Sequence, residues 1–149
     1  MSKNCPLCGA DISSGEQCRD RFDQCLAWEF ENPAAFGKVH FLTVACYMLQ
    51  HNAYSQKAWL ETREMVAQFV RQGISPANLS RRNRQRLDGS RRDWSITRGA
   101  KLVGFDAIIW SRTIADIRVN DPDIYCADIE RWAKSIVEDT EIVVQKFAL

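Results

Sequence analysis

Apolar side chains recur at helical spacing along most of the chain. In the first such stretch, Phe22 is followed three and four residues later by Cys25 and Leu26, and Leu26 four residues later by Phe30. This spacing places side chains on one face of a helix. Serines at 13 and 14 precede Glu16 and Gln17 by three residues, as in a capping box. We therefore expect a helix from about Gly15 to Glu31.

A second helix follows almost at once. Asn32 and Pro33 mark a stop and a restart, because Asn caps helices and Pro is favoured at their first position. From Phe36 to Gln50 the side chains are mostly apolar, which predicts a helix that is buried nearly all round. Two helices joined by so short a turn are expected to lie antiparallel.

An antiparallel hairpin makes specific residues neighbours. Residues equally far from the turn meet, so Cys18 is expected to face His51 at the open end of the hairpin. Nearer the turn, His40 is expected to lie beside Glu29. A Glu beside a His would be either an acid/base pair or a mutually satisfied structural pair, and the sequence leaves both open.

The rest of the chain predicts two further helices. Ser55 is a candidate cap and Gly73 a candidate terminator for a helix over 55–73. Asn120, Asp121 and Pro122 mark the start of a C-terminal helix, expected over about 122–146. Between them, the segment near 113–119 mixes helix and strand periods, and we expect it to be short and extended or irregular.

These elements predict a mainly α-helical fold, a bundle of four to five helices with an N-terminal zinc knuckle. A chain of 149 residues fits a single domain. Its expected parts are a knuckle (1–14), a helical hairpin (15–51), a helix (55–73), an Arg-rich segment (76–101) and a C-terminal helix (122–146). The longest apolar run, at 41–49, is too short to span a bilayer, and no signal peptide precedes the knuckle, so we expect a cytoplasmic protein without membrane partners.

The knuckle is the strongest chemical motif. Cys5, Pro6, Leu7, Cys8 and Gly9 place two thiols two residues apart before a glycine that permits a tight turn. The cytosol would keep the six cysteines reduced, so the pair favours a metal over disulfides. A thioredoxin-like role would require a preceding strand, which this N-terminal position does not offer.

Structural zinc takes four ligands, and helix geometry selects the remaining two. Cys18 and Cys25 are too far apart on one helix to share an ion, and so are His40 and His51. The set that closes is Cys5, Cys8, Cys18 and His51. Whether His40 or Cys25 replaces one of these ligands is left open, and Cys46 and Cys126 are expected to be core residues.

Two motifs also resemble those of an uncharacterised family of small bacterial proteins of unknown function. Its members begin with CPxCG and carry an HxLTVxxYxLQH helix, often followed by Pro. This chain has CPLCG at 5–9 and HFLTVACYMLQH at 40–51, with Asn52 in the place of Pro, a downstream Cys18, and Trp132-Ala133 in the C-terminal helix. The resemblance covers most of the chain and implies no activity. It draws attention to Glu29, His40, Tyr47, Gln50 and His51.

Charge is polarised along the chain. Residues 81–101 hold seven arginines and one lysine against two aspartates, a net charge of +6 in a chain whose total is +1. Arginines bind phosphate and Trp94 can stack on a base. The candidate nucleic-acid contacts are Arg81, Arg82, Arg84, Arg86, Arg91, Arg92, Trp94 and Arg98. Solvation, or pairing with acidic helices, is the favoured alternative.

Three functions remain in order of preference. The first is a zinc-binding helical module, with a structural Zn²⁺, that binds an unknown protein partner. The second is a nucleic-acid-associated protein using the segment from Arg81 to Lys101. The third is an enzyme built on Glu29 and His40, which is less favoured because no Gly-rich phosphate loop, GxSxG or HExxH motif accompanies them. Partner, substrate and oligomeric state do not follow from the sequence.

Overall fold

The computed structural model describes residues 4–12, 17–73 and 99–147. Four α-helices lie in these ranges: α1 (Cys18–Glu31), α2 (Pro33–Gln50), α3 (Gln56–Gln72) and α5 (Pro122–Gln145). Two 3-10 helices, η2 (Phe105–Ala107) and η3 (Ile114–Asp116), lie between α3 and α5. No described residue belongs to a strand. The predicted helical bundle with a cysteine cluster near its N-terminus is confirmed.

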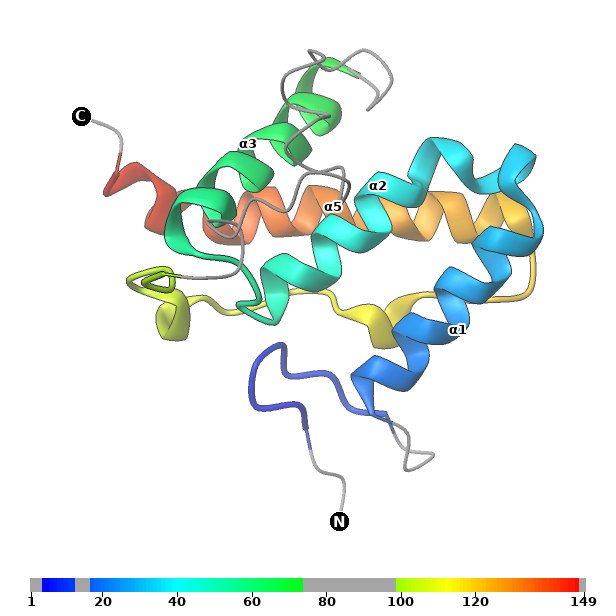
Figure 1. Ribbon diagram of the computed structural model, residues 1–149, viewed down its shortest axis with the longest axis horizontal. Coiled ribbons are helices and arrows are strands. Elements are labelled where there is room, and N and C mark those ends of the chain that lie inside the picture. The colour runs from blue at the N-terminus through cyan, green and yellow to red at the C-terminus, as the bar shows by residue number, and fades with distance from the viewer. Residues whose placement is uncertain (1–3, 13–16, 74–98, 148–149) are drawn as a thin grey trace.

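Helices α1 and α2 form the expected antiparallel hairpin (Figure 1). A single residue, Asn32, separates them. Its N–H donates to the Glu29 carbonyl at 3.2 Å, and its own carbonyl accepts from Ala35 and Phe36 at 3.0 and 3.1 Å. Asn32 therefore closes α1 and opens α2, while Pro33 occupies the first helical position, where no N–H is needed.

Helix α1 begins at Cys18, about three residues later than the sequence predicts. Gln17 is extended, with φ −93° and ψ 163°, and its N–H donates to the Asp20 carboxylate at 2.9 Å. Asp20, three residues after the cap residue Gln17, thus fixes the start of α1. The serine capping box expected at 13–16 lies outside the described residues.

The predicted ends of α3 and the predicted start of α5 agree with the structure. Ser55 accepts a hydrogen bond from the Ala58 N–H, and Gly73 closes α3 with a left-handed φ of +69°. Asp121 accepts from the N–H groups of Asp123 and Ile124 at 2.9 and 3.1 Å, so α5 is capped by its carboxylate.

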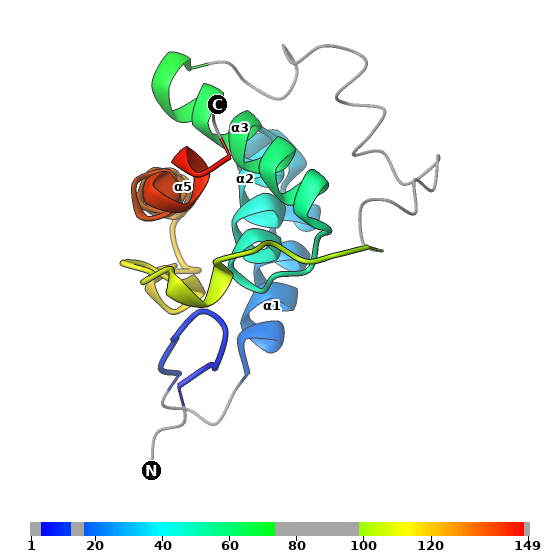
Figure 2. The same ribbon diagram turned by 90° about the vertical axis from the view of Figure 1, so that its left-hand side faces the viewer.

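Helix α2 is the centre of the core and packs against α1, α3 and α5 (Figures 1 and 2). Its fully buried apolar side chains include those of Phe36, Val39, Leu42, Cys46 and Leu49. The helix is not buried all round, however. Beyond its first turn, Gly37 and His40 are exposed.

The segment before α5 joins the N-terminal loop to the helices. In both ribbon views it runs between that loop and the bundle (Figures 1 and 2). It is irregular around η3, as expected, and two hydrogen bonds tie it to the helices. The Gln50 side chain donates to the Arg112 carbonyl at 2.7 Å, and the Ser111 N–H donates to the Asp139 carboxylate at 2.7 Å. Within the segment, the Asp116 carboxylate accepts from the Thr113 N–H at 2.9 Å.

Another expectation falls outside the described residues. The candidate nucleic-acid contacts, which are the arginines from Arg81 to Arg98 and Trp94, all lie there. Within the described ranges, none of the helices combines the length and the apolar character that a membrane span requires.

Candidate metal centre

The N-terminal knuckle is a tight hydrogen-bonded loop. The Gly9 N–H donates to the Cys5 carbonyl at 2.8 Å, and the Cys5 N–H donates to the Ala10 carbonyl at 2.9 Å. Gly9 has a φ of +79°, which a side chain would strain. The loop therefore presents Cys5 and Cys8 from one turn, as the CPLCG motif predicts.

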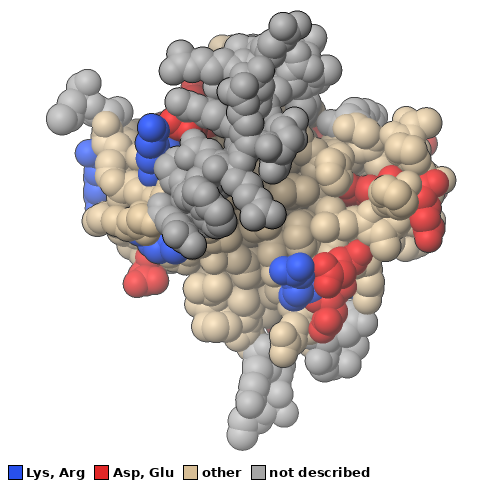
Figure 3. Space-filling model, in the orientation of Figure 1, with Lys and Arg blue, Asp and Glu red and all other residues tan. Residues whose placement is uncertain are grey.

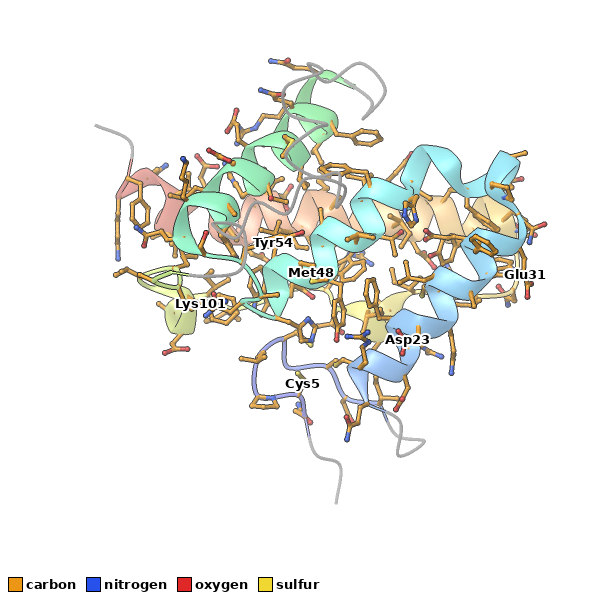
Figure 4. All side chains as sticks on the ribbon, viewed as in Figure 1. Cys5, Asp23, Glu31, Met48, Tyr54 and Lys101 are labelled. Atoms are coloured by element: carbon orange, nitrogen blue, oxygen red, sulfur yellow. The ribbon has the colours of Figure 1, made fainter. Side chains whose placement is uncertain are left out.

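The structure brings together the four side chains that the sequence selects. The sulfurs of Cys5, Cys8 and Cys18 and a ring nitrogen of His51 all lie within 4.8 Å of one another. The Cys5 sulfur is 3.7 Å from His51 Nε2, and the sulfurs of Cys8 and Cys18 are 3.5 Å apart. Figure 4 shows Cys5 on the loop that lies against the end of α2.

These separations fit a tetrahedral ion. Zinc bonds of about 2.3 Å to sulfur and 2.0–2.1 Å to nitrogen imply edges of roughly 3.8 Å between sulfurs and 3.5 Å between sulfur and nitrogen. The observed 3.5 and 3.7 Å lie close to those edges, and all four ligand atoms lie within 4.8 Å of one another. The group could therefore hold a metal ion such as zinc.

The His51 ring is oriented by its own helix. Its Nδ1 lies 2.7 Å from the Tyr47 carbonyl one turn earlier, so Nδ1 carries the proton and donates it. Nε2 is then left with a lone pair on the side of the cysteines. Tyr47 also stacks on the ring at 4.1 Å and on Phe22 of α1 at 4.0 Å, which locks the imidazole between the two helices.

The electrostatics of the group favour a cation. Burial raises the pKa values of Cys8 and Cys18, so without an ion both remain thiols at neutral pH. Burial also acts on Cys5, but hydrogen bonds from the backbone at Cys8 and Leu7 outweigh it and lower the pKa of Cys5. Burial lowers the pKa of His51, which keeps the imidazole neutral. A divalent ion would supply the positive charge that ionises the buried thiols.

The remaining cysteines lie elsewhere. Cys25 and Cys46 are completely buried in the core, and burial raises the pKa of Cys25 to about 11. Cys126 is also buried and contacts the Ala35 carbonyl. His40 contacts Glu29 rather than the cysteines. Neither His40 nor Cys25 thus belongs to the described cluster.

Comparison with known proteins adds a family but no activity. Residues 3–141 match the family of unknown function DUF5946. The chain belongs to this family. That result agrees with the resemblance in the CPLCG and HFLTVACYMLQH motifs, and it extends over most of the chain. No curated protein and no solved structure matches the sequence of this DUF5946 member.

A second polar cluster lies near the turn of the hairpin in this DUF5946 chain. The Glu29 side chain is buried, and its Oε1 accepts from His40 Nδ1 at 2.7 Å. Its Oε2 accepts from Thr43 at 2.6 Å and from the Tyr125 hydroxyl of α5. The sequence predicts the contact of Glu29 with His40 but not the two hydroxyls. Thr43 could have been found, because it lies three residues from His40 on the same helix.

A groove opens beside the knuckle. Its volume is about 530 Å³, and it lies between residues 5–11 and residues 108–116. The Trp110 indole N–H donates to the Leu7 carbonyl at 3.2 Å and ties the two walls together. Two apolar side chains of its lining, Leu7 and Ile109, are exposed at 42% and 85%. The groove has two acidic residues in its lining, Asp11 and Asp116, and no lysine or arginine.

Proposed function

We propose that this DUF5946 protein binds one structural Zn²⁺ through Cys5, Cys8, Cys18 and His51 and uses the knuckle so fixed to bind a protein partner. The observation that carries the proposal is the convergence of four ligand atoms within 4.8 Å from three separate elements. Such an ion would join the loop to the start of α1 and the end of α2.

A structural ion is favoured over a catalytic one. Three cysteines and one histidine fill the tetrahedral shell of zinc, whereas catalytic zinc keeps a position for water or substrate. The other histidine of the chain, His40, is hydrogen-bonded to Glu29. The ion would therefore contribute folding free energy rather than a reactive water.

The groove beside the knuckle supports a partner of defined chemistry. Its exposed Leu7 and Ile109 suit an apolar side chain, because burying such surface is the main favourable term in association. The carboxylates of Asp11 and Asp116, with no cation in the lining, suit a neighbouring Lys or Arg. The proposed ligand is thus a protein segment that pairs an apolar residue with a basic one.

The zinc part is tested by elemental mass spectrometry on the purified protein and on Cys18→Ser and His51→Ala. We expect one zinc per chain in the wild type and a lower content in both variants. Cys126→Ala is the matched control, because it removes a buried thiol outside the cluster. A wild type that is free of metal after purification without chelator would overturn the proposal.

The partner part is tested with two synthetic peptides, one pairing Leu with Lys and one pairing Leu with Glu, by fluorescence anisotropy. We expect the lysine peptide to bind more tightly, and Ile109→Ser to weaken it by about tenfold, as for loss of one buried anchor. Ile142→Ser is the control, since Ile142 is 73% exposed on α5 and does not line the groove. Equal binding of both peptides, or equal loss in both variants, would rule out the groove.

A further inference from the structure

The Glu29 cluster leaves one reactive atom at the surface. His40 is the second histidine of the chain, and its side chain is 58% exposed although Glu29 beneath it is 2% exposed. We propose that His40 Nε2 accepts a phosphoryl group from a phosphorylated protein. This inference does not depend on the zinc site, because the two groups share no residue.

Hydrogen bonding fixes the tautomer of His40. The hydroxyls of Thr43 and Tyr125 donate to Oε2 of Glu29, so the carboxyl group acts as an acceptor in this cluster. The proton between Glu29 and His40 is therefore on Nδ1, which lies 2.7 Å from Oε1. Nε2, on the opposite side of the ring, then carries the lone pair and has no hydrogen-bond partner among the described residues.

The carboxylate also makes the imidazole a stronger nucleophile. The hydrogen bond to Glu29 raises the pKa of His40 against a smaller opposing effect of burial. Thr43 and Tyr125 hold Glu29 from α2 and α5, so the carboxylate cannot turn away when the ring becomes charged. Glu29 is thus a positioning residue that stabilises the imidazolium formed when Nε2 reacts.

Gly37 provides an independent observation. Gly37 lies one turn before His40 on α2, and a helical side chain leans toward the N-terminal turn. Nothing lies within 4 Å of a Cβ added to Gly37, so packing does not require glycine there, and glycine weakens a helix interior. Glycine thus presents no side chain on the turn before His40, whereas a long side chain there could reach toward the ring.

The surroundings of His40 favour a group delivered by another macromolecule. The His40 side chain is 58% exposed, so its ring is open to the surface of a partner, and the groove of about 530 Å³ lies apart from it at the knuckle. The described face around α2 is largely uncharged (Figure 3), which a docking protein can cover. An acyl group on so exposed an imidazole would be hydrolysed quickly, whereas a phosphoryl group on nitrogen persists at neutral pH.

The transfer step balances without a further reactant. The Nε2 lone pair attacks phosphorus, the bond from phosphorus to the donor breaks, and the donor leaves with that electron pair. Nδ1 keeps its proton, so the ring becomes a phosphorylated imidazolium whose positive charge faces the Glu29 carboxylate. With phosphoramidate as the donor, the leaving group is ammonia.

The test is phosphorylation of the full-length protein by phosphoramidate, followed by ³¹P NMR and by mass spectrometry of the modified peptide. The reference is the double variant His40→Asn with Lys134→His, which places a histidine at an exposed position of α5. We expect His40 to react about tenfold faster than this reference, as a lower bound for a positioned nucleophile. His51 serves as the internal control, since its Nε2 faces the cysteines.

Two variants separate reactivity from folding. Glu29→Gln is expected to reduce the rate on His40 by about tenfold, toward the reference, because the ring charge loses its counter-ion. Gly37→Leu leaves the core intact and is expected to slow the reaction by about threefold through hindrance. Circular dichroism confirms that each variant is folded. Equal rates for His40 and the reference, or a Gly37→Leu rate equal to the wild type, would overturn the proposal.

Discussion

The two ends of the α1–α2 hairpin are joined by different chemistry. At the open end, three thiols and an imidazole converge from the knuckle, α1 and α2, with sulfur contacts of 3.5 and 3.7 Å. Near the turn, one carboxylate, that of Glu29, accepts three hydrogen bonds from α2 and α5. The first group offers ligand atoms for an ion but makes few hydrogen bonds within the chain. In the second group, the Glu29 carboxylate has its hydrogen-bond partners without an ion.

The cysteine and histidine cluster therefore needs a bound ion to satisfy its ligand atoms, whereas the folded chain itself satisfies the Glu29 carboxylate. Thiols are weak hydrogen-bond groups, so their mutual contacts stabilise little until a cation ionises them. The Glu29 carboxylate gains its hydrogen-bond partners from the chain itself. Within this cluster, His40 Nε2 has no hydrogen-bond partner among the described residues. Substitutions at the two ends should therefore respond differently to metal, and four predictions test this.

The largest effect is expected from Cys8→Ser. In the zinc-loaded protein it should lower the free energy of unfolding by on the order of several kcal/mol, because metal-binding free energy is folding free energy. Urea unfolding with one equivalent of zinc measures the loss. Chelation of the wild type should produce a similar loss, whereas chelation of the variant should add little.

The control for this comparison is Cys126→Ala, which shortens a buried side chain outside the cluster. Its unfolding free energy should still fall sharply on chelation, as in the wild type. If zinc-loaded Cys8→Ser unfolds at the same urea concentration as the wild type, the open end of the hairpin is not held by an ion.

A somewhat smaller effect is expected from Glu29→Ala. The change leaves the buried Tyr125 hydroxyl without its acceptor, leaves Thr43 only the Val39 carbonyl and opens a cavity, which should cost about 3 kcal/mol. Tyr125→Phe removes one donor and should cost about 1 kcal/mol. Both losses should be the same with and without chelator. A loss of zinc in Glu29→Ala would show instead that the two ends are coupled.

The helices of this fold are readable from local signals. Asn32-Pro33, Ser55, Gly73 and Asp121 each act within a few residues, so the bounds of α2, α3 and α5 follow closely from the sequence. The start of α1 does not, because two capping patterns compete there. Asp20 bonds the Gln17 N–H and places the start after the serines.

Side-chain neighbours were predictable only where the hairpin geometry is local. The pairing of Cys18 with His51 and of Glu29 with His40 follows from equal distances to the turn. The Tyr125 hydroxyl on Glu29 arrives from 96 residues away, and no periodicity in the sequence encodes that contact. The groove beside the knuckle depends likewise on Trp110, 103 residues from Leu7.

A modest effect is expected from Trp110→Phe. The variant keeps an aromatic ring but loses the indole N–H that donates to the Leu7 carbonyl, which should lower the unfolding free energy by about 1 kcal/mol. The loss should be smaller in the zinc-loaded protein, where the ion already restrains the knuckle. Ile109→Ser is the control and should change stability little, since its side chain is 85% exposed. An equal loss with and without zinc would mean that the ion does not restrain the loop.

The smallest effect concerns the pH dependence at His40. Because Glu29 raises the pKa of His40 above 6.5, its protonated form stabilises the fold fully below that pH. This contribution is lost as the pH rises through the folded-state pKa.

The difference in unfolding free energy between wild type and His40→Asn should thus be largest near pH 6 and decline by about pH 9, and solvent exposure keeps it small. Measuring both proteins with the same zinc load cancels the protonation of the thiols, which belongs to the other end. A difference that instead grows with pH would mean that the folded protein holds His40 in its neutral form, and that Glu29 does not supply the charge on which the reactivity of Nε2 depends.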